Sequence, residues 1–124
     1  MIVNKIPWHQ FKTNIKNYIY IDELHNFITK VIINEKPEQI VLFGSIANKV
    51  FDWNSDADLF ILFNYPCHFQ TAKNKLLRYT TLKDNMIHPF PYYINDFNNL
   101  AENPNLFIHK ALKDSILIYQ NSNY

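Results

Sequence analysis

Apolar residues recur over residues 22–35 with the period of an amphipathic helix. Their spacing of i, i+3, i+4, i+7 and i+8 places them on one helical face, which would pack against a core. The positions on this face are Leu24, Phe27, Ile28, Val31 and Ile32. Two acidic residues suit the start of such a helix, and Pro37 predicts that it ends just before that position.

Two apolar runs further along the chain predict buried strands. Residues 39–43, QIVLF, are rich in β-branched and aromatic side chains and stop at Gly44. A brief helical turn over residues 46–50 is expected to follow. Residues 57–63 are apolar except at Asp58, as in a central strand that is covered on both faces. A carboxylate inside such a strand calls for an explanation other than packing.

The second half of the chain alternates between helical and strand patterns. The expected elements are a helix from Pro66 to about Lys83, a strand from Met86 to Phe90, a helical segment from Asn95 to Ala101, a helix from Pro104 to near Lys113 and a strand over residues 115–119. The whole pattern predicts an α/β (α+β) fold with a mixed sheet of about four strands flanked by helices. The 124 residues are expected to form one domain, 1–124, with a core over about 22–119.

Composition and charge narrow the classes of partner and location. Because 48% of the residues are hydrophobic and 16% aromatic, the chain can close a core of its own. Twelve Lys and Arg against eleven Asp and Glu give a net charge of +1, which argues against direct binding of nucleic acid. The single cysteine, Cys67, cannot form an internal disulfide, and no segment reads as a signal peptide or as a membrane span of ~18 apolar residues. A soluble, cytoplasmic protein without membrane contact is therefore expected.

Gly44 is the only glycine in the chain, and Ser45 follows it directly. A strand that ends in Gly-Ser before a helical turn presents backbone N–H groups and a hydroxyl, which suit phosphate oxygens. Glycine also lets a phosphate approach the backbone closely. An ordinary turn would equally explain the pair on its own, so its meaning depends on its neighbours.

Two carboxylates, Asp56 and Asp58, follow the Gly-Ser pair further along the chain. Side chains alternate along a strand, so two carboxylates separated by one residue lie on the same face. They can share one Mg²⁺, whose other ligands are usually water and substrate phosphate. Capping or solvated carboxylates are common at such places too. The ordered combination of strand, Gly-Ser, short helix, Asp-x-Asp and apolar strand is more specific than either pair, and it indicates polyphosphate transfer.

The segment LFGSIANKVFDWNSDADLFILF, residues 42–63, resembles the signature of the polymerase-beta-type nucleotidyltransferase superfamily, and specifically its minimal nucleotidyltransferase (MNT) branch. The resemblance implies the polymerase-beta-like fold. It also implies that Gly44 and Ser45 hold the triphosphate and that Asp56 and Asp58 bind the metal.

The resemblance continues into the second half of the chain but departs from the family at one catalytic position. Residues 87–97 are similar to the third strand of the family and its following helix, and residues 105–119 to its closing helix and strand. Complete members carry a third carboxylate on that strand, which helps to deprotonate the acceptor hydroxyl, and His88 stands there in this register. Asp84 or Asp96 could replace it if the register slips, although both suit surface or helix-end positions better.

The Gly-Ser loop departs from the family as well. Asn48 and Lys49 stand where relatives often carry Arg and Gly, which removes one cation and a second flexible point. Lys49 could still contact a phosphate, or it could simply be solvated.

Two other nucleophile arrangements find less support in the sequence. Cys67 and His68 are adjacent, and adjacent side chains on a helix point about 100° apart. Ser45 lacks the Gly-x-Ser-x-Gly pattern of a hydrolase elbow.

The resemblance implies transfer of a nucleoside monophosphate, AMP from ATP before other NTPs, from a Mg²⁺-bound or Mn²⁺-bound triphosphate to a hydroxyl. Asp56, Asp58 and His88 would be its catalytic residues. Stand-alone members of the branch resemble antitoxins that add AMP to a tyrosine of a helical HEPN-type toxin, so a HEPN-type protein is the expected partner. The short chain leaves no space for a separate acceptor-binding domain, which favours a protein acceptor.

Two alternatives stay open. His88 and the altered loop also fit a catalytically impaired module that keeps the fold and neutralises its partner by binding alone. A small-molecule (antibiotic) nucleotidyltransferase would need an added domain or a dimer to form its acceptor pocket. The sequence does not select the nucleotide base, the acceptor or a homo-oligomeric or hetero-oligomeric state.

Overall fold

The computed structural model describes residues 4–7, 21–47, 56–80 and 86–121. In chain order the elements are β1 (Asn4–Lys5), α2 (Ile21–Glu35), β2 (Gln39–Phe43), β3 (Ala57–Phe63), α3 (Phe69–Leu77), β4 (Ile87–Tyr93), α4 (Ile94–Ala101), α5 (Phe107–Ala111), the 3-10 turn η2 (Leu112–Asp114) and β5 (Ile116–Gln120). None of the helices in these ranges has the length and apolar content needed to cross a bilayer.

The strands form one mixed sheet in the order β1-β5-β2-β3-β4. β2 is antiparallel to both of its neighbours, β3 and β5, whereas β4 runs parallel to β3. The expected mixed sheet of about four strands is thus confirmed. The two-residue strand β1 adds a fifth member beside β5, and it is too short to leave a periodic pattern in the sequence.

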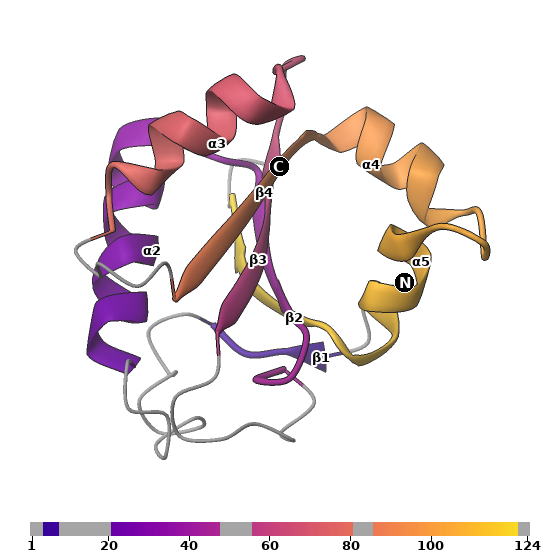
Figure 1. Ribbon diagram of the computed structural model, residues 1–124, viewed down its shortest axis with the longest axis horizontal. Helices are drawn as coiled ribbons and strands as arrows, with labels where there is room; N and C mark the ends of the chain where they lie inside the picture. The colour runs from indigo at the N-terminus through magenta and orange to yellow at the C-terminus, as the bar shows by residue number, and fades with distance from the viewer. Residues whose placement is uncertain (1–3, 8–20, 48–55, 81–85, 122–124) are drawn as a thin grey trace.

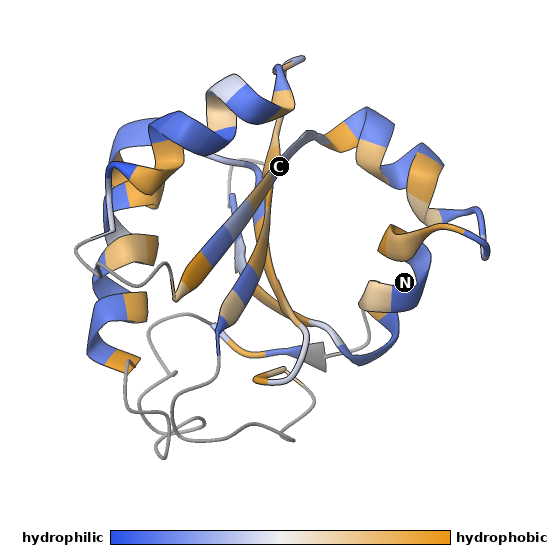
Figure 2. Ribbon diagram, viewed as in Figure 1, coloured by the Kyte–Doolittle hydropathy of each residue, from blue (hydrophilic) through white to orange (hydrophobic). Residues whose placement is uncertain are grey.

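Helices cover both faces of this sheet. Figure 1 shows α2 and α3 on one side of the strands and α4 and α5 on the other. The orange, apolar sides of these helices turn toward the sheet in Figure 2, while their blue sides face outward. This arrangement explains why β3 is apolar at almost every position, since every residue of the strand except Asp58 is buried.

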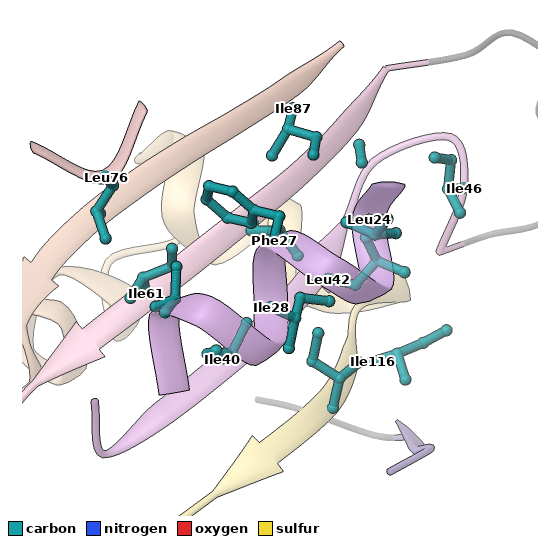
Figure 3. Packing of buried hydrophobic residues seen from close by; sticks show 14 of the residues in the cluster. Leu24, Phe27, Ile28, Ile40, Leu42, Ile46, Ile61, Leu76, Ile87 and Ile116 are labelled. Carbon is teal, nitrogen blue, oxygen red and sulfur yellow. The ribbon is translucent and has the colours of Figure 1, made fainter. Parts of the chain in front are cut away.

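The first core lies between α2 and the sheet. Leu24, Phe27 and Ile28 point from α2 toward Ile40 and Ile61 of the neighbouring strands β2 and β3 (Figure 3). All five side chains are buried. The predicted apolar face of the first helix is therefore the face that packs. The helix ends at Glu35, where Lys36 follows with a left-handed φ of 50°.

The second core, under α4 and α5, is built around aromatic rings. Phe60 of β3 is its centre, with Phe43 stacked on it at 4.0 Å between centroids and Phe97 of α4 edge-on at 5.0 Å. Ile108 and Leu112 complete this layer from the C-terminal helical segment. Phe60 is entirely buried, so this cluster fixes α4 and α5 against the face of β3 that carries Asp58 and Phe60.

The helix that the sequence predicts from Pro66 is shorter than expected. It begins at Phe69, because the His68 ring nitrogen Nδ1 accepts the Thr71 N–H at 3.3 Å and acts as the N-cap. At the other end, 3-10-type hydrogen bonds between residues i and i+3 replace the α-helical ones. An example is the Tyr79 N–H to Leu76 O bond at 3.0 Å. The regular helix stops at Leu77, and the predicted end near Lys83 lies outside the described residues.

The third predicted strand is longer than expected, reaching Tyr93 rather than Phe90. β4 is an edge strand of the sheet. Ala57 donates its N–H to Met86 O at 2.7 Å, and the alternation of a parallel ladder then turns the nitrogens of Pro89 and Pro91 away from β3. Prolines are tolerated at such outward positions because no hydrogen bond to β3 is lost.

The last helix begins at Phe107, not at Pro104. Pro104 lies in a turn in which Asn103 O accepts the Leu106 N–H at 3.1 Å and Asn103 Oδ1 accepts the Asn105 N–H. Asparagine followed by proline at the front of a four-residue turn is a common turn signature, and here it delays the helix.

A polar contact ties α2 to the end of α3. Tyr79 donates its hydroxyl hydrogen to Glu35 Oε2, and Lys75 Nζ lies 3.1 Å from Glu35 Oε1. The Glu35 side chain is only 8% exposed, so loss of one partner leaves a largely desolvated carboxylate. We expect Tyr79→Phe to lower the free energy of unfolding by about 1–2 kcal/mol, measured by urea denaturation at pH 7.

The same contact makes alkaline stability depend on Tyr79. The hydrogen bond to Glu35 raises the pKa of the Tyr79 phenol above its usual value of 10.0. Because the pKa is higher in the folded chain, the hydrogen bond contributes fully to the free energy of unfolding below pH 10. This contribution is lost as the pH rises through the higher folded pKa. The stability difference between wild type and Tyr79→Phe should therefore shrink above pH 10. A difference that stays constant to pH 12 would contradict this assignment.

Candidate active site

Gly44 ends β2 in a conformation that other residues rarely adopt. Its φ is +81°, in the left-handed region. A Cβ at this position would lie 2.6 Å from the Asp58 Oδ2 atom of the next strand. The only glycine of the chain is therefore required both by the backbone and by the space beside an aspartate.

Asp58 lies in the interior of the sheet. Its register partners are Phe43 on β2 and His88 on β4. Asp56 directly precedes β3, two residues before Asp58, and the alternation of the strand directs both carboxylates to one face. The sequence prediction that the pair shares a face is consistent with the contacts that both make to His88.

His88 lies between the two carboxylates. Its Nε2 atom is 3.3 Å from Asp56 Oδ2, and its Nδ1 atom is 3.6 Å from Asp58 Oδ1. When the imidazole is protonated, these contacts are ion pairs. The side chains are 47% exposed at Asp56, 39% at His88 and 28% at Asp58, so the group is accessible to solvent and to a ligand. The group thus joins residues from two separate parts of the sequence, the start of β3 and the start of β4.

The electrostatics of the group centre on Asp58. Partial burial raises the pKa of its carboxyl above the ordinary 3.8, and the neighbouring charge of Asp56 raises that pKa further. His88 acts in the opposite direction and lowers the pKa of Asp58. The fold thus holds the Asp58 carboxylate at a cost relative to water, and a bound cation would offset that cost.

The donor set fits a divalent cation that arrives with a polyphosphate. Asp56 and Asp58 offer hard oxygen ligands, and the missing side chain of Gly44 leaves space directly beside Asp58 Oδ2. Among the residues that the structure describes, no group of three or more His, Cys, Asp or Glu side chains has the arrangement of a self-sufficient metal site. A site in which two protein carboxylates and the phosphates of a substrate share the cation agrees with the space beside Asp58 and with the small number of protein ligands.

The remaining predicted site residues are placed less centrally. Ser45 follows Gly44 in the turn and is half-buried. Asp96 lies exposed in the first turn of α4, after the opposite end of β4 from His88, and does not join the group. The alternative third carboxylate at Asp84 and the loop residues Asn48 and Lys49 are outside the described ranges.

Cys67 and His68 do not form a nucleophile pair. They precede α3 rather than lying on it, and His68 serves as its N-cap. Burial raises the pKa of the Cys67 thiol, and the charge of Asp96 adds to this effect. A raised pKa disfavours the reactive thiolate.

One feature of the site escaped the sequence analysis. A cavity of about 630 Å³ opens beside Gly44, between the end of β2 and α5. Its lining residues are Phe43, Gly44, Asn105, Phe107, Lys110, Ala111 and Asp114. The sequence gives one indication of this cavity. Ile108 and Leu112, spaced i and i+4, form the inward face of the last helical segment, and Phe107 falls outside that face.

Comparisons with known proteins agree with this arrangement. The family model described as "Polymerase beta, Nucleotidyltransferase" matches residues 26–124, which include the whole candidate site. Among solved structures, a candidate nucleotidyltransferase from Sulfolobus solfataricus is similar over 82% of this chain and 86% of its own, with a TM-score of 0.53 and 14% identity. At that identity the similarity concerns the fold alone. No protein of curated function shows significant sequence similarity to the chain.

Proposed function

The chain belongs to the polymerase beta nucleotidyltransferase family, and on that premise we propose that it transfers a nucleoside monophosphate from a nucleoside triphosphate to a hydroxyl of a partner protein. The observation that carries the proposal is the convergence of Asp56, Asp58 and His88 beside the side-chain-free space at Gly44. In the reaction the acceptor oxygen forms a bond to the α-phosphorus. The bond from that phosphorus to the bridging oxygen breaks, and pyrophosphate leaves.

Asp56 and Asp58 are proposed to hold the divalent cation, Mg²⁺ or Mn²⁺. When bound, such a cation neutralises charge on the phosphate oxygens and orients them. Gly44 leaves the backbone free to approach the β and γ phosphates, and Ser45 offers its hydroxyl as a further donor. These roles rest on the geometry of the turn and on the family resemblance.

His88 is proposed to receive the proton of the acceptor hydroxyl. In the register that the family resemblance implies, it takes the place of the third carboxylate of complete members, and a neutral imidazole is a suitable general base. Its contact with Asp56, at 3.3 Å, would orient the ring and stabilise the imidazolium that forms.

The space beside His88 is smaller than an ordinary small-ligand pocket, which favours a single side chain of a partner protein as the acceptor group. A second cavity, of about 260 Å³, opens on the α3 side of His88 and is lined by Lys73, Leu77 and Ile87. This cavity shares no lining residue with the Gly44 cavity, so nucleotide and acceptor are proposed to occupy separate spaces. We propose, following the MNT resemblance, that the acceptor is a tyrosine of a helical HEPN-type toxin and that the nucleotide is ATP.

The direct test is transfer of label. The purified chain is incubated with ATP labelled in its α-phosphate, with Mg²⁺ or Mn²⁺, and with a HEPN-type protein from the same source. Label is expected on the partner, and mass spectrometry should show an added AMP on tyrosine. No transfer under either metal to any such partner would refute the proposal.

A binding module without catalysis is the second candidate, because His88 itself can satisfy the two carboxylates and take the place of a metal. The double variant Asp56→Asn and Asp58→Asn separates the two functions. We expect it to lose suppression of the partner in a growth assay while it still co-purifies with that partner. Full suppression by the double variant would favour neutralisation by binding alone.

A further inference from the structure

Phe107 is an exposed aromatic ring held on a rigid base. It is 50% exposed, yet its inner side meets Phe43 at 5.7 Å, Phe60 at 6.0 Å and Phe90 at 6.1 Å between ring centroids. Three rings from three different strands thus fix its position. The outer part of the ring faces the cavity that also touches Gly44.

The charges around this cavity suit an uncharged planar group. Lys110 and Asp114 are both exposed, stand one helical turn apart at i and i+4, and largely offset each other. Phe43, Phe107 and Ala111 supply apolar walls. The volume of about 630 Å³ lies within the range of small-ligand pockets. Among the described residues that line the cavity there is no excess of positive charge, so these residues would contribute little to binding a polyphosphate alone.

The cavity adjoins the candidate active site through Gly44 and Phe43. Gly44 lines the cavity and also lies against Asp58 Oδ2, while Phe43 is both a wall of the cavity and the strand partner of Asp58. Phe43 and Asp58 are paired across neighbouring strands, so their side chains lie on one face of the sheet. A molecule with its phosphates at Gly44 can therefore extend directly over Phe107.

We propose that this cavity holds the nucleoside part of the triphosphate, with the base stacked on Phe107. The inference rests on the proposed function. Stacking tolerates every base because each has a π-face, but a purine covers more of the ring than a pyrimidine. Purine nucleotides are accordingly the preferred substrates, and Asn105, at the rim, offers both a donor and an acceptor to the base edge.

The test compares two probes by isothermal titration calorimetry with Mn²⁺ present. ATP carries phosphates and a base, whereas inorganic tripolyphosphate carries only the phosphates. We expect Phe107→Ala to weaken ATP binding about 5- to 100-fold and to leave tripolyphosphate binding unchanged. ATP should bind the wild type more tightly than CTP, and this difference should disappear in the variant.

The chain offers a matched control. Tyr65 is 49% exposed and lines a different cavity, together with Glu35 and Cys67, so Tyr65→Ala removes a comparable ring away from the site. It should bind both probes like the wild type. Phe107→Leu keeps apolar volume without a ring and should behave like Phe107→Ala even if the alanine variant folds poorly. Phe107→Trp should retain ATP affinity.

The outcomes separate this inference from the proposed function. If the wild type binds both probes and the Phe107 variants bind ATP as tightly as the wild type, the stacking site is refuted while nucleotidyl transfer stands. If Phe107→Leu weakens both probes equally, the ring acts through the phosphate site and the inference again fails. If the wild type binds neither probe, the proposed function falls, and the stacking site falls with it.

Discussion

Asp58→Asn is expected to reduce nucleotidyl transfer by about 1,000-fold and, at the same time, to stabilise the metal-free chain. Removal of one group that stabilises transition-state charge typically costs a factor of that order. Asn is nearly isosteric, so the space beside Gly44 is preserved. The ionised carboxylate is, however, less favourable in the fold than in water, because burial, offset in part by His88, raises the pKa of Asp58 and Asp56 adds to this effect. A neutral amide avoids this penalty, and we expect a gain of about 1 kcal/mol in the free energy of unfolding at pH 7 in EDTA.

The raised pKa of Asp58 also determines how the stability gain of Asp58→Asn changes with pH. Because the pKa of Asp58 is higher in the folded chain than its ordinary 3.8, the folded state binds the proton more tightly. The wild type therefore loses stability as the pH rises from that value through the raised folded pKa. Asn does not titrate, so the advantage of the variant should appear over this interval and vanish in stronger acid.

Asp56→Asn is the matched control for this pair of effects. Asp56 is 47% exposed against 28% for Asp58, so its charge is better solvated. Transfer should fall in both variants, but the stability gain should be smaller at Asp56. If Asp58→Asn destabilises the chain instead, the carboxylate has a structural role, and its assignment as a ligand held at an energetic cost is wrong.

The periodic segments of the fold could be predicted from the sequence. The apolar spacing of α2 and the unbroken apolar runs of β2 and β3 report directly on burial, and their predicted bounds agree with the structure within one residue. Burial is the physical quantity that a hydrophobic pattern encodes. Segments that are packed on one or both faces therefore leave a clear pattern.

The element ends could not be predicted as well, because local hydrogen bonds decide them. The N-cap at His68 and the turn at Asn103 each moved a helix start three residues beyond the proline from which it was expected. Proline is favourable at the first helical position, but it is equally favourable in a turn. The sequence pattern does not distinguish these two uses.

The candidate site could be proposed from the sequence where its residues are close along the chain. Gly44, Asp56 and Asp58 belong to one strand–turn–strand unit, so their spacing alone indicates a shared site. His88 required the family register, and its position is consistent with the parallel pairing of β3 and β4. Phe107 could not be found in this way, because its exposure depends on how α5 packs against three separate strands.

Gly44→Ala is expected to impair both stability and nucleotide binding. A φ of +81° costs a residue with a Cβ about 1–3 kcal/mol. The new Cβ would also lie 2.6 Å from Asp58 Oδ2, and because that oxygen is the end of a side chain, the carboxylate would rotate away rather than the strands separate. We expect a loss of about 2 kcal/mol in the free energy of unfolding. The displaced ligand and the blocked phosphate approach should weaken Mn²⁺-ATP binding about 100-fold, as measured by calorimetry.

Lys36→Gly is the control that separates backbone strain from the site. Lys36 is the only non-glycine residue with a positive φ in the described part of the chain, at 50°, and it precedes β2 on the side away from Gly44. Glycine there removes strain, so the free energy of unfolding should stay within about 1 kcal/mol of the wild type, and nucleotide affinity should not change. A Gly44→Ala variant that loses stability but binds Mn²⁺-ATP normally would show that this glycine serves only the turn. The phosphate-binding role assigned to it would then have to be abandoned, since the left-handed backbone by itself would explain its presence.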